Sequence, residues 1–318
     1  MRTRFELVIA DGGDDARARA AGEAAFAEVA EAERLLSAHR DDAELFRVNA
    51  LAGSAPVTVD ARLFALLESA LELCAASAGA FDLTLGALLT AWNHAGMAAG
   101  GAGEAPSPER IDEARARCGM ARLLSLDRAA GSVRFGAPGM RLDAGAIGKG
   151  YALEQAGVVL QELGVGSALM HGGTSTVLAL GSDPAGRPWR VAIRDPADGQ
   201  GMIATADLAN RALSVSAVHG RSFSSGGRRY GHVIDPRSGW PVQGNLLAAV
   251  ITPHATASDA WSTALLVLGG EGFALLAAHQ PTAAGLLVRE EADGRMVVDL
   301  HGNGFTLSGT AGGSPGRG

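Results

Sequence analysis

Lys149 is the only lysine in the chain, and it stands in the glycine-rich stretch Asp143-Ala-Gly-Ala-Ile-Gly-Lys-Gly-Tyr151. A lysine ammonium is a compact, mobile charge, whereas the arginine used elsewhere in the chain is a planar fork. Glycines let a ligand approach the backbone, and the start of a helix attracts anions. The stretch therefore predicts a lysine that reaches an anionic group such as phosphate. The alternative is that one lysine escaped a coding bias by chance.

The stretch fails two common nucleotide motifs. A Walker A loop needs a glycine five residues before its Gly-Lys pair and a Ser or Thr after it, but Asp143 and Gly150 hold these positions. A dinucleotide fingerprint needs the spacing GxGxxG, and Gly145, Gly148 and Gly150 have the reverse spacing. What remains is a cation and a glycine turn at a helix N-terminus.

A second candidate lies in the segment Thr256-Ala-Ser-Asp-Ala-Trp-Ser-Thr-Ala264. Asp259 and Thr263 are four residues apart, so they share one face of a helix. A carboxylate and a hydroxyl are hard oxygen ligands that suit Mg²⁺. The alternative is a carboxylate favoured by the helix dipole near the N-terminus, with a threonine that is merely tolerated.

Three further motifs are each unspecific when taken alone. His232 is expected on a strand before the turn Asp235–Gly239, and it could act as a general base or be an ordinary strand histidine. Gly79–Thr84 follows a helix and could be a helix stop with an Asx turn. Gly172-Gly173 ends a strand, which suggests close approach of a ligand or of another backbone.

The elements expected around these residues indicate an α+β fold. The first strand lies within residues 1–10, and two more lie near 122–127 and 132–136. Apolar periodicity and capping residues predict four main helices, at about 14–38, 60–77, 149–163 and 256–268. Helices come first and strands later, without regular βαβ alternation. We expect a single domain over residues 1–308, with a flexible surface loop at about 95–108 and a disordered tail at 309–318.

Composition and charge indicate which partners and which cellular compartment to expect. Hydrophobic residues make up 47% of the chain and the net charge is −7 without a basic block, which argues against nucleic acid as the main partner. Cys74 and Cys118 fit no zinc or CxxC spacing and are expected to be buried thiols. The apolar run at the N-terminus is too short for a secretory signal, and no stretch approaches a membrane span. We therefore expect a cytoplasmic protein.

The order of these motifs resembles the ApbE-type flavin transferases, the FAD:protein FMN transferases, over nearly the whole chain. Gly79–Thr84 is similar to the GAFDxT signature of that family, and Asp143–Tyr151 to its DLGGIAKGY turn. Leu36–Asn49 looks like its early helix-to-loop segment. The remaining matches follow in the family's order and are Gly172-Gly173, Trp189–Pro196, His232–Gly239 and Asp259–Thr263.

The resemblance implies a mixed fold of antiparallel sheets packed with helices and a Mg²⁺-dependent reaction on FAD. Such enzymes cleave the FAD pyrophosphate, attach FMN through a phosphoester to a Ser or Thr of an acceptor protein, and release AMP. The expected partners are therefore FAD and an acceptor protein with a flavinylation-type motif.

The resemblance also assigns roles to individual residues. Asp259 and Thr263 would bind the metal through side-chain oxygens, and Ala152 through its carbonyl. Lys149 would lie along the FAD phosphates. The remaining assignments are the backbone of Ala80, Phe81 and Asp82 at the flavin ring, Gly172 and Gly173 at the cofactor, and His232 as the base for the incoming hydroxyl.

Several positions depart from the family pattern. The family's Asn-x-Gly-Gly-Asp reads His171-Gly-Gly-Thr174 after Met170, and its Ser-Gly-x-Tyr reads Ser216-Ala-Val-His219. Ala43 stands where Ser is usual. These changes concern nucleotide orientation and acceptor recognition more than the metal. Two alternatives therefore stay open: an FAD pyrophosphatase that forms FMN and AMP, and a flavin-binding protein without turnover.

Overall fold

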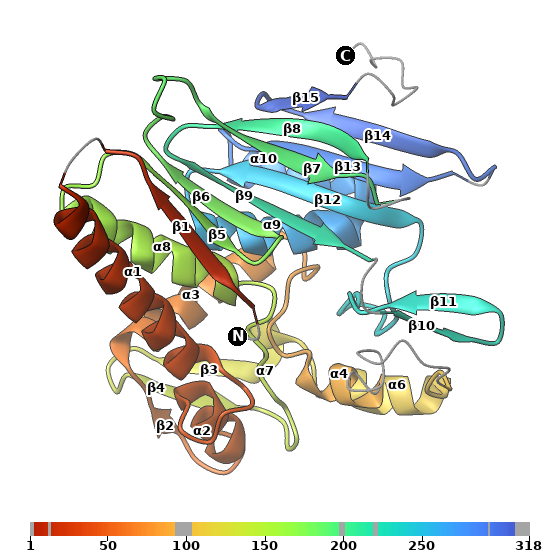
Figure 1. Cartoon of the computed structure of the whole chain (residues 1–318). Helices are drawn as coiled ribbons and strands as arrows, with labels where there is room; N and C mark the ends of the chain where they lie inside the picture. Colours follow the sequence, from red (N-terminus) through yellow and green to blue (C-terminus); the bar gives the residue numbers. More distant parts are fainter. Residues whose placement is uncertain are drawn as a thin grey trace. The chain divides into compact units, whose positions relative to one another are not determined.

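The structure is a computed structural model that describes residues 3–11, 14–92, 104–196, 201–218, 222–291 and 293–308. Helices and antiparallel strands occur together, so the predicted α+β class is confirmed (Figure 1). The predicted tail at 309–318 and most of the predicted loop at 95–108 lie outside the described residues.

The four helices predicted at about 14–38, 60–77, 149–163 and 256–268 begin and end close to these bounds in the structure. Asp14 precedes the first helix, and its side chain accepts a hydrogen bond from the amide of Ala16 at 3.0 Å. The helices are α1 (Asp15–Leu36), α2 (Glu44–Leu51), α3 (Ala61–Ala76), α4 (Gly86–Ala91), α6 (Pro108–Arg115), α7 (Met120–Leu123), α8 (Gly148–Glu162), α9 (Ala255–Leu268), the 3₁₀ turn η1 (Gly269–Glu271) and α10 (Gly272–His279).

The strands pair antiparallel throughout the described sheets. They are β1 (Phe5–Ile9), β2 (Val57–Thr58), β3 (Leu124–Asp127), β4 (Ser132–Phe135), β5 (Ala168–Gly172), β6 (Thr176–Leu180), β7 (Trp189–Arg194), β8 (Met202–Leu208), β9 (Arg211–Ala217), β10 (Ser222–Ser225), β11 (Arg228–Gly231), β12 (Asn245–Thr252), β13 (Ala284–Glu290), β14 (Met296–His301) and β15 (Phe305–Leu307).

The chain divides into two compact units. The first unit comprises Ala30–Gly148 and Val218–Gln243, and the second comprises Arg2–Val29, Lys149–Ala217 and Gly244–Gly318. The single domain expected over residues 1–308 stays a prediction.

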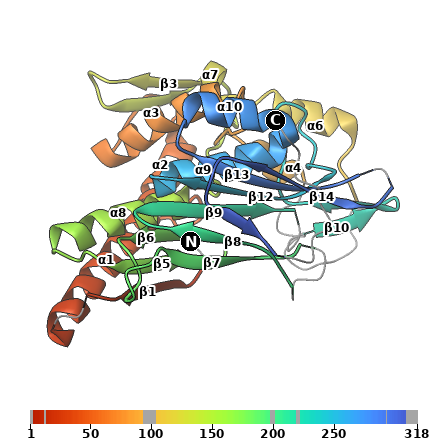
Figure 2. The same cartoon turned by 90° about the horizontal axis from the view of Figure 1, so that it is seen from above.

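The second unit is built in layers around a seven-stranded sheet with the order β1-β5-β6-β9-β12-β13-β14. Successive side chains of a strand point to opposite faces, and β6 illustrates the result. Val177 and Ala179 face an apolar core shared with the three-stranded sheet β15-β8-β7. Leu178 and Leu180 face the core that α1 and α8 cover. α9 packs along β9 and β12 (Figure 2).

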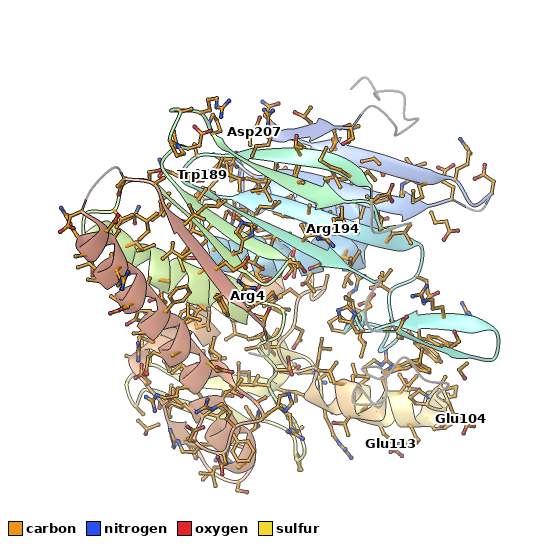
Figure 3. All side chains as sticks on the ribbon, in the orientation of Figure 1. Arg4, Glu104, Glu113, Trp189, Arg194 and Asp207 are labelled. Atoms are coloured by element: carbon orange, nitrogen blue, oxygen red, sulfur yellow. The ribbon has the colours of Figure 1, made fainter. Side chains whose placement is uncertain are left out.

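Polar contacts at β7 reinforce the second unit. The indole N–H of Trp189, at the start of β7, donates to the carbonyl of Leu180 on β6 at 3.2 Å. Arg190 pairs with Asp207 across β7 and β8 at 2.7 Å. Figure 3 labels Trp189 and Asp207 on these strands. The first contact ties the small sheet to the large one.

The first unit contains the helices α2, α3, α4, α6 and α7, the sheet β2-β4-β3 and the hairpin β10-β11. An aromatic cluster lies between α4, α6 and the hairpin, where the ring centroid of Trp92 lies 5.2 Å from those of Tyr230 and Trp240. Trp92 also donates its indole N–H to the carbonyl of Gly239 at 2.8 Å. This bond fixes the turn after β11 to α4.

The capping signals of α3 act as predicted. Asp60 caps its N-terminus by accepting from the amide of Arg62 at 2.8 Å. At its C-terminus, Gly79 has φ +77° and donates its amide to the carbonyl of Cys74 at 2.8 Å. A positive φ at this position favours glycine, which therefore ends the helix.

Both cysteines are buried thiols, as the sequence predicts. Cys74 is 3% exposed and Cys118 is 4% exposed, and neither forms a disulfide. Burial raises the pKa of Cys74 to about 12, with the Asp82 carboxylate adding to the shift. Burial also raises the pKa of Cys118 to about 11. Both side chains are therefore thiols rather than thiolates at neutral pH.

One expectation about membranes needs correction. The stretch Ala255–His279 has the length and apolar composition of a membrane span, with a mean hydropathy of 1.4. More than half of that window is buried inside the protein, and a core helix passes the same test. It also contains the buried carboxylate of Asp259. The stretch is weak evidence for a span, and it forms part of the core of the second unit.

A buried and an exposed leucine on the neighbouring strands β13 and β14 offer a direct test of the core. Leu286 on β13 is fully buried, and its partner Leu300 on β14 is 44% exposed. Leu286→Ala should lower the free energy of unfolding by about 3 kcal/mol because it leaves a cavity. Leu300→Ala should change it by less than about 0.5 kcal/mol. Urea denaturation of both variants checks this, and equal losses would contradict the difference in burial between the two side chains.

Candidate active site

The helices α8 and α9 touch through their backbones at Gly150. A Cβ built on Gly150 would lie 2.1 Å from the carbonyl oxygen of Ala255 and 2.8 Å from the Cβ of Asp259. No side chain fits into that space, so only glycine permits this approach. The contact brings the start of α8, with Lys149, against the first turns of α9.

Asp259 accepts from three donors, which belong to two elements of the second unit, α8 and β6. Its side chain is 5% exposed, and the ammonium of Lys149 lies 3.3 Å from Oδ1 and 3.4 Å from Oδ2. The amide of Gly150 donates to Oδ2 at 3.0 Å, and the hydroxyl of Thr176 on β6 donates to Oδ1 at 3.4 Å. A buried carboxylate needs such compensation. The predicted Lys149 and Asp259 are therefore brought together.

A chain of hydroxyls continues along α9 from Asp259. The Oγ of Ser216 on β9 lies 2.8 Å from the Oγ of Ser262 and 3.1 Å from the Oγ1 of Thr263. Ser262 and Thr263 also donate to the carbonyl of Asp259, at 2.9 Å and 3.4 Å. The predicted Thr263 is thus held half-buried, one turn beyond Asp259.

Ala152 is fully buried on α8, three residues beyond Lys149. A regular helix pairs its carbonyl with the amide four residues later. Its role as a backbone ligand stays a prediction.

The two predicted glycines, Gly172 at the end of β5 and Gly173 directly after it, contact residues at or directly before the start of β1. The amide of Gly173 donates to the carbonyl of Arg4 at 2.8 Å, and its φ is +66°. A Cβ on Gly172 would lie 3.2 Å from the ring of Phe5 on β1. Side-chain packing therefore accounts for Gly172, and a positive φ with a backbone hydrogen bond accounts for Gly173. A role of either glycine at the cofactor stays a prediction.

His171 precedes these glycines on β5 at one of the positions that depart from the family pattern. Burial lowers its pKa, and the carboxylate of Glu6 on β1 opposes that shift. The imidazole is therefore mainly neutral at neutral pH.

In the first unit, Ala80, Phe81 and Asp82 form a fixed, buried turn after α3. Asp82 accepts from the amide of Met120 at 2.8 Å through Oδ2. Its Oδ1 accepts from the amide of Thr84 at 2.6 Å and from the Thr84 hydroxyl at 2.5 Å. The amide of Phe81 donates to the hydroxyl of Ser77 at 3.1 Å. Asp82 is therefore an anchor of the turn, and its backbone role at the flavin stays a prediction.

His232 lies in the first unit, but not on a strand as predicted. β11 ends at Gly231, and His232 forms part of the bend that leads to the turn Asp235–Gly239. The strand ends because the backbone of Ile234 turns back to pair with Pro241. The role of His232 as a base stays a prediction.

Comparisons with known proteins identify the family of this chain. The model of the ApbE family matches residues 1–287.

The chain belongs to the ApbE family.

Among its relatives, a protein named FAD:protein FMN transferase from Treponema pallidum is 35% identical over 291 residues, which cover 86% of this chain and 78% of that protein. The apo crystal structure of the flavinyl transferase ApbE of Pseudomonas stutzeri has a TM-score of 0.78 at 30% identity and covers 93% of this chain and 90% of that one. The crystal structure of an ApbE protein of Thermotoga maritima has a TM-score of 0.80 at 26% identity, with coverages of 92% and 93%. The predicted ApbE-like fold is therefore confirmed.

Three polar residues of this ApbE-family site were not predicted as site residues. They are Thr176, Ser216 and Ser262, which meet Asp259 and Thr263. Ser262 stands beside Asp259 in the motif, so helical spacing could have suggested it. Thr176 and Ser216 lie on separate strands, and their approach to α9 depends on how the sheet packs.

Gly150 tests the contact between α8 and α9. Gly150→Ala should force the helices apart and cost several kcal/mol of stability, because the added methyl meets backbone atoms. Gly148→Ala is the matched control, since its Cβ would meet no atom closer than 3.7 Å. Thermal unfolding of both variants checks this. A Gly150→Ala variant as stable as the wild type would show that the helices do not touch there.

Proposed function

We propose that this chain is an FAD:protein FMN transferase. The hydroxyl oxygen of a Ser or Thr in an acceptor protein attacks the FMN phosphorus, the P–O bond to the AMP half breaks, and AMP leaves. The pairing of Lys149 with Asp259 on helices in backbone contact is the observation that supports this best. Membership in the ApbE family and a 35% identical relative named FAD:protein FMN transferase support it further.

A divalent metal fits the chemistry of the second unit. The described residues contain no cluster of three His, Cys, Asp or Glu side chains. Mg²⁺ is commonly held by one or two carboxylates together with substrate phosphates, so a single carboxylate suffices. Asp259 and Thr263 would hold it with side-chain oxygens, and Ala152 with its carbonyl. When bound, the metal neutralises the charge that develops on the pyrophosphate oxygens.

The protein's own residues have separate tasks in this proposal. Lys149 places an ammonium along the FAD phosphates and pairs with Asp259. The buried network of Ser216, Ser262 and Thr263 fixes the orientation of the Thr263 hydroxyl. His232 takes the proton of the acceptor hydroxyl, and the turn Ala80–Asp82 contacts the flavin. Cytoplasmic localisation stays a prediction.

The deciding experiment incubates the purified chain with FAD and Mg²⁺, with and without EDTA, and with and without a peptide carrying a flavinylation-type Ser or Thr. The transferase should release AMP and form covalent FMN-peptide only when metal and peptide are present. AMP and free FMN without the peptide would show a pyrophosphatase instead. FAD bound and recovered intact under all conditions would show a binding protein.

Asp259→Asn tests the metal assignment in the same assay. The amide keeps the shape of the side chain but loses the charge, so metal-dependent AMP release should fall at least about 100-fold. Circular dichroism should show an unchanged fold. Wild-type AMP release by the folded variant would remove Asp259 from the metal site.

Lys149→Arg tests the ammonium. A guanidinium can form a bidentate pair with Asp259 and hold the carboxylate away from a metal. We expect AMP release to fall at least about tenfold, with a higher requirement for Mg²⁺. If FAD affinity and rate equal those of the wild type, the solitary lysine has no special function.

A further inference from the structure

Glu154 joins the two helices of the candidate site one turn beyond Gly150. It lies on α8, and its Oε2 accepts from the amide of Thr256 in the first turn of α9 at 2.9 Å. Its Oε1 lies 3.2 Å from Nδ1 of His254. The carboxylate side chain is 27% exposed, whereas that of His254 is 70% exposed.

This contact replaces a cap that α9 does not supply itself. His254 occupies the N-cap position of α9 and makes no side-chain cap hydrogen bond. The first amides of a helix lack partners within the helix, and a negative charge stabilises that end. Glu154 provides both an acceptor and a charge from a different helix.

Glu154 and Gly150 form two consecutive contacts between the helices. They are four residues apart and therefore lie on the same face of α8. Gly150 donates to the carboxylate of Asp259, and Glu154 accepts from Thr256, which lies three residues before Asp259. A helix held at two points one turn apart cannot rotate about its axis without breaking one of them.

We propose that Glu154 is a positioning residue that sets the orientation of α9 and thereby directs the Asp259 carboxylate toward the metal. This inference rests on the proposed function for its activity readout. It predicts that losing the cap changes the affinity for the metal more than the affinity for FAD. Outer residues that orient metal ligands commonly have effects of about 10- to 100-fold on metal affinity.

The test compares Glu154→Ala and Glu154→Gln with Glu162→Ala, which removes an exposed glutamate at the end of α8. The first measurement is AMP release as a function of Mg²⁺ at saturating FAD and acceptor peptide. The second is Mn²⁺ binding to the protein followed by electron paramagnetic resonance, which requires no turnover. Thermal unfolding and the KM for FAD are recorded for every variant.

Glu154→Ala should raise the half-saturating Mg²⁺ concentration about tenfold and weaken Mn²⁺ binding by a similar factor. The KM for FAD should change by less than about twofold, because the residue acts through Asp259 rather than on the substrate. Glu154→Gln retains an oxygen that can accept from Thr256 and should show a smaller increase. Glu162→Ala should match the wild type.

A purely structural role would give a different result. If Glu154→Ala only lowers the unfolding temperature and binds Mn²⁺ like the wild type, the proposal is overturned. If Glu154→Ala does not fold, Mn²⁺ binding by Glu154→Gln is compared with the wild type instead, and equal binding overturns the proposal. If the wild type releases no AMP, the proposed function fails, while the ratio of Mn²⁺ affinities still tests the positioning role. Equal binding by wild type and variant, including none by either, refutes it.

Discussion

The candidate site depends on the backbone contact of α8 and α9 at Gly150. An α-helix with side chains is about 10 Å wide, and helices normally pack at that kind of distance. Because Gly150 has no Cβ, the two helices come closer at this point, and the carbonyl oxygen of Ala255 lies where a Cβ would otherwise be. The amide of Gly150 can then reach the Asp259 carboxylate directly. Without this approach, Lys149 and Asp259 would belong to two separate surfaces.

The second constraint is the burial of a charge. Asp259 lies between α9 and the seven-stranded sheet, where an isolated carboxylate would be unstable. The ammonium of Lys149 lies near both oxygens, the amide of Gly150 donates to Oδ2, and the hydroxyl of Thr176 donates to Oδ1, so three donors share the compensation. The sheet contributes because Thr176 on β6 and Ser216 on β9 reach residues of α9. Apolar residues of the same strands belong to the two cores of the unit.

Much of this could be predicted from the sequence because it depends on local signals. Asp14, Asp60 and Gly79 mark helix ends through interactions within a few residues, and the structure confirms them. The i, i+4 spacing correctly placed Asp259 and Thr263 on one helix. The end of β11 before His232 was missed because it depends on the pairing of Ile234 with Pro241, which lies across a turn. The hydroxyls of Thr176 and Ser216 were missed because local periodicity does not predict the order of strands in a sheet.

The solitary lysine also has a chemical consequence. Lys149 carries the only ε-amino group of the chain, and its side chain is 23% exposed. The protein therefore has two kinds of primary amine, the α-amino group at the N-terminus and the Lys149 amine in the candidate site. Reductive methylation with a ¹³C label would place a single lysine resonance beside Asp259. The chemical shift of that resonance should change when an anion or a cation binds beside Lys149, so this residue can report on binding in the candidate site.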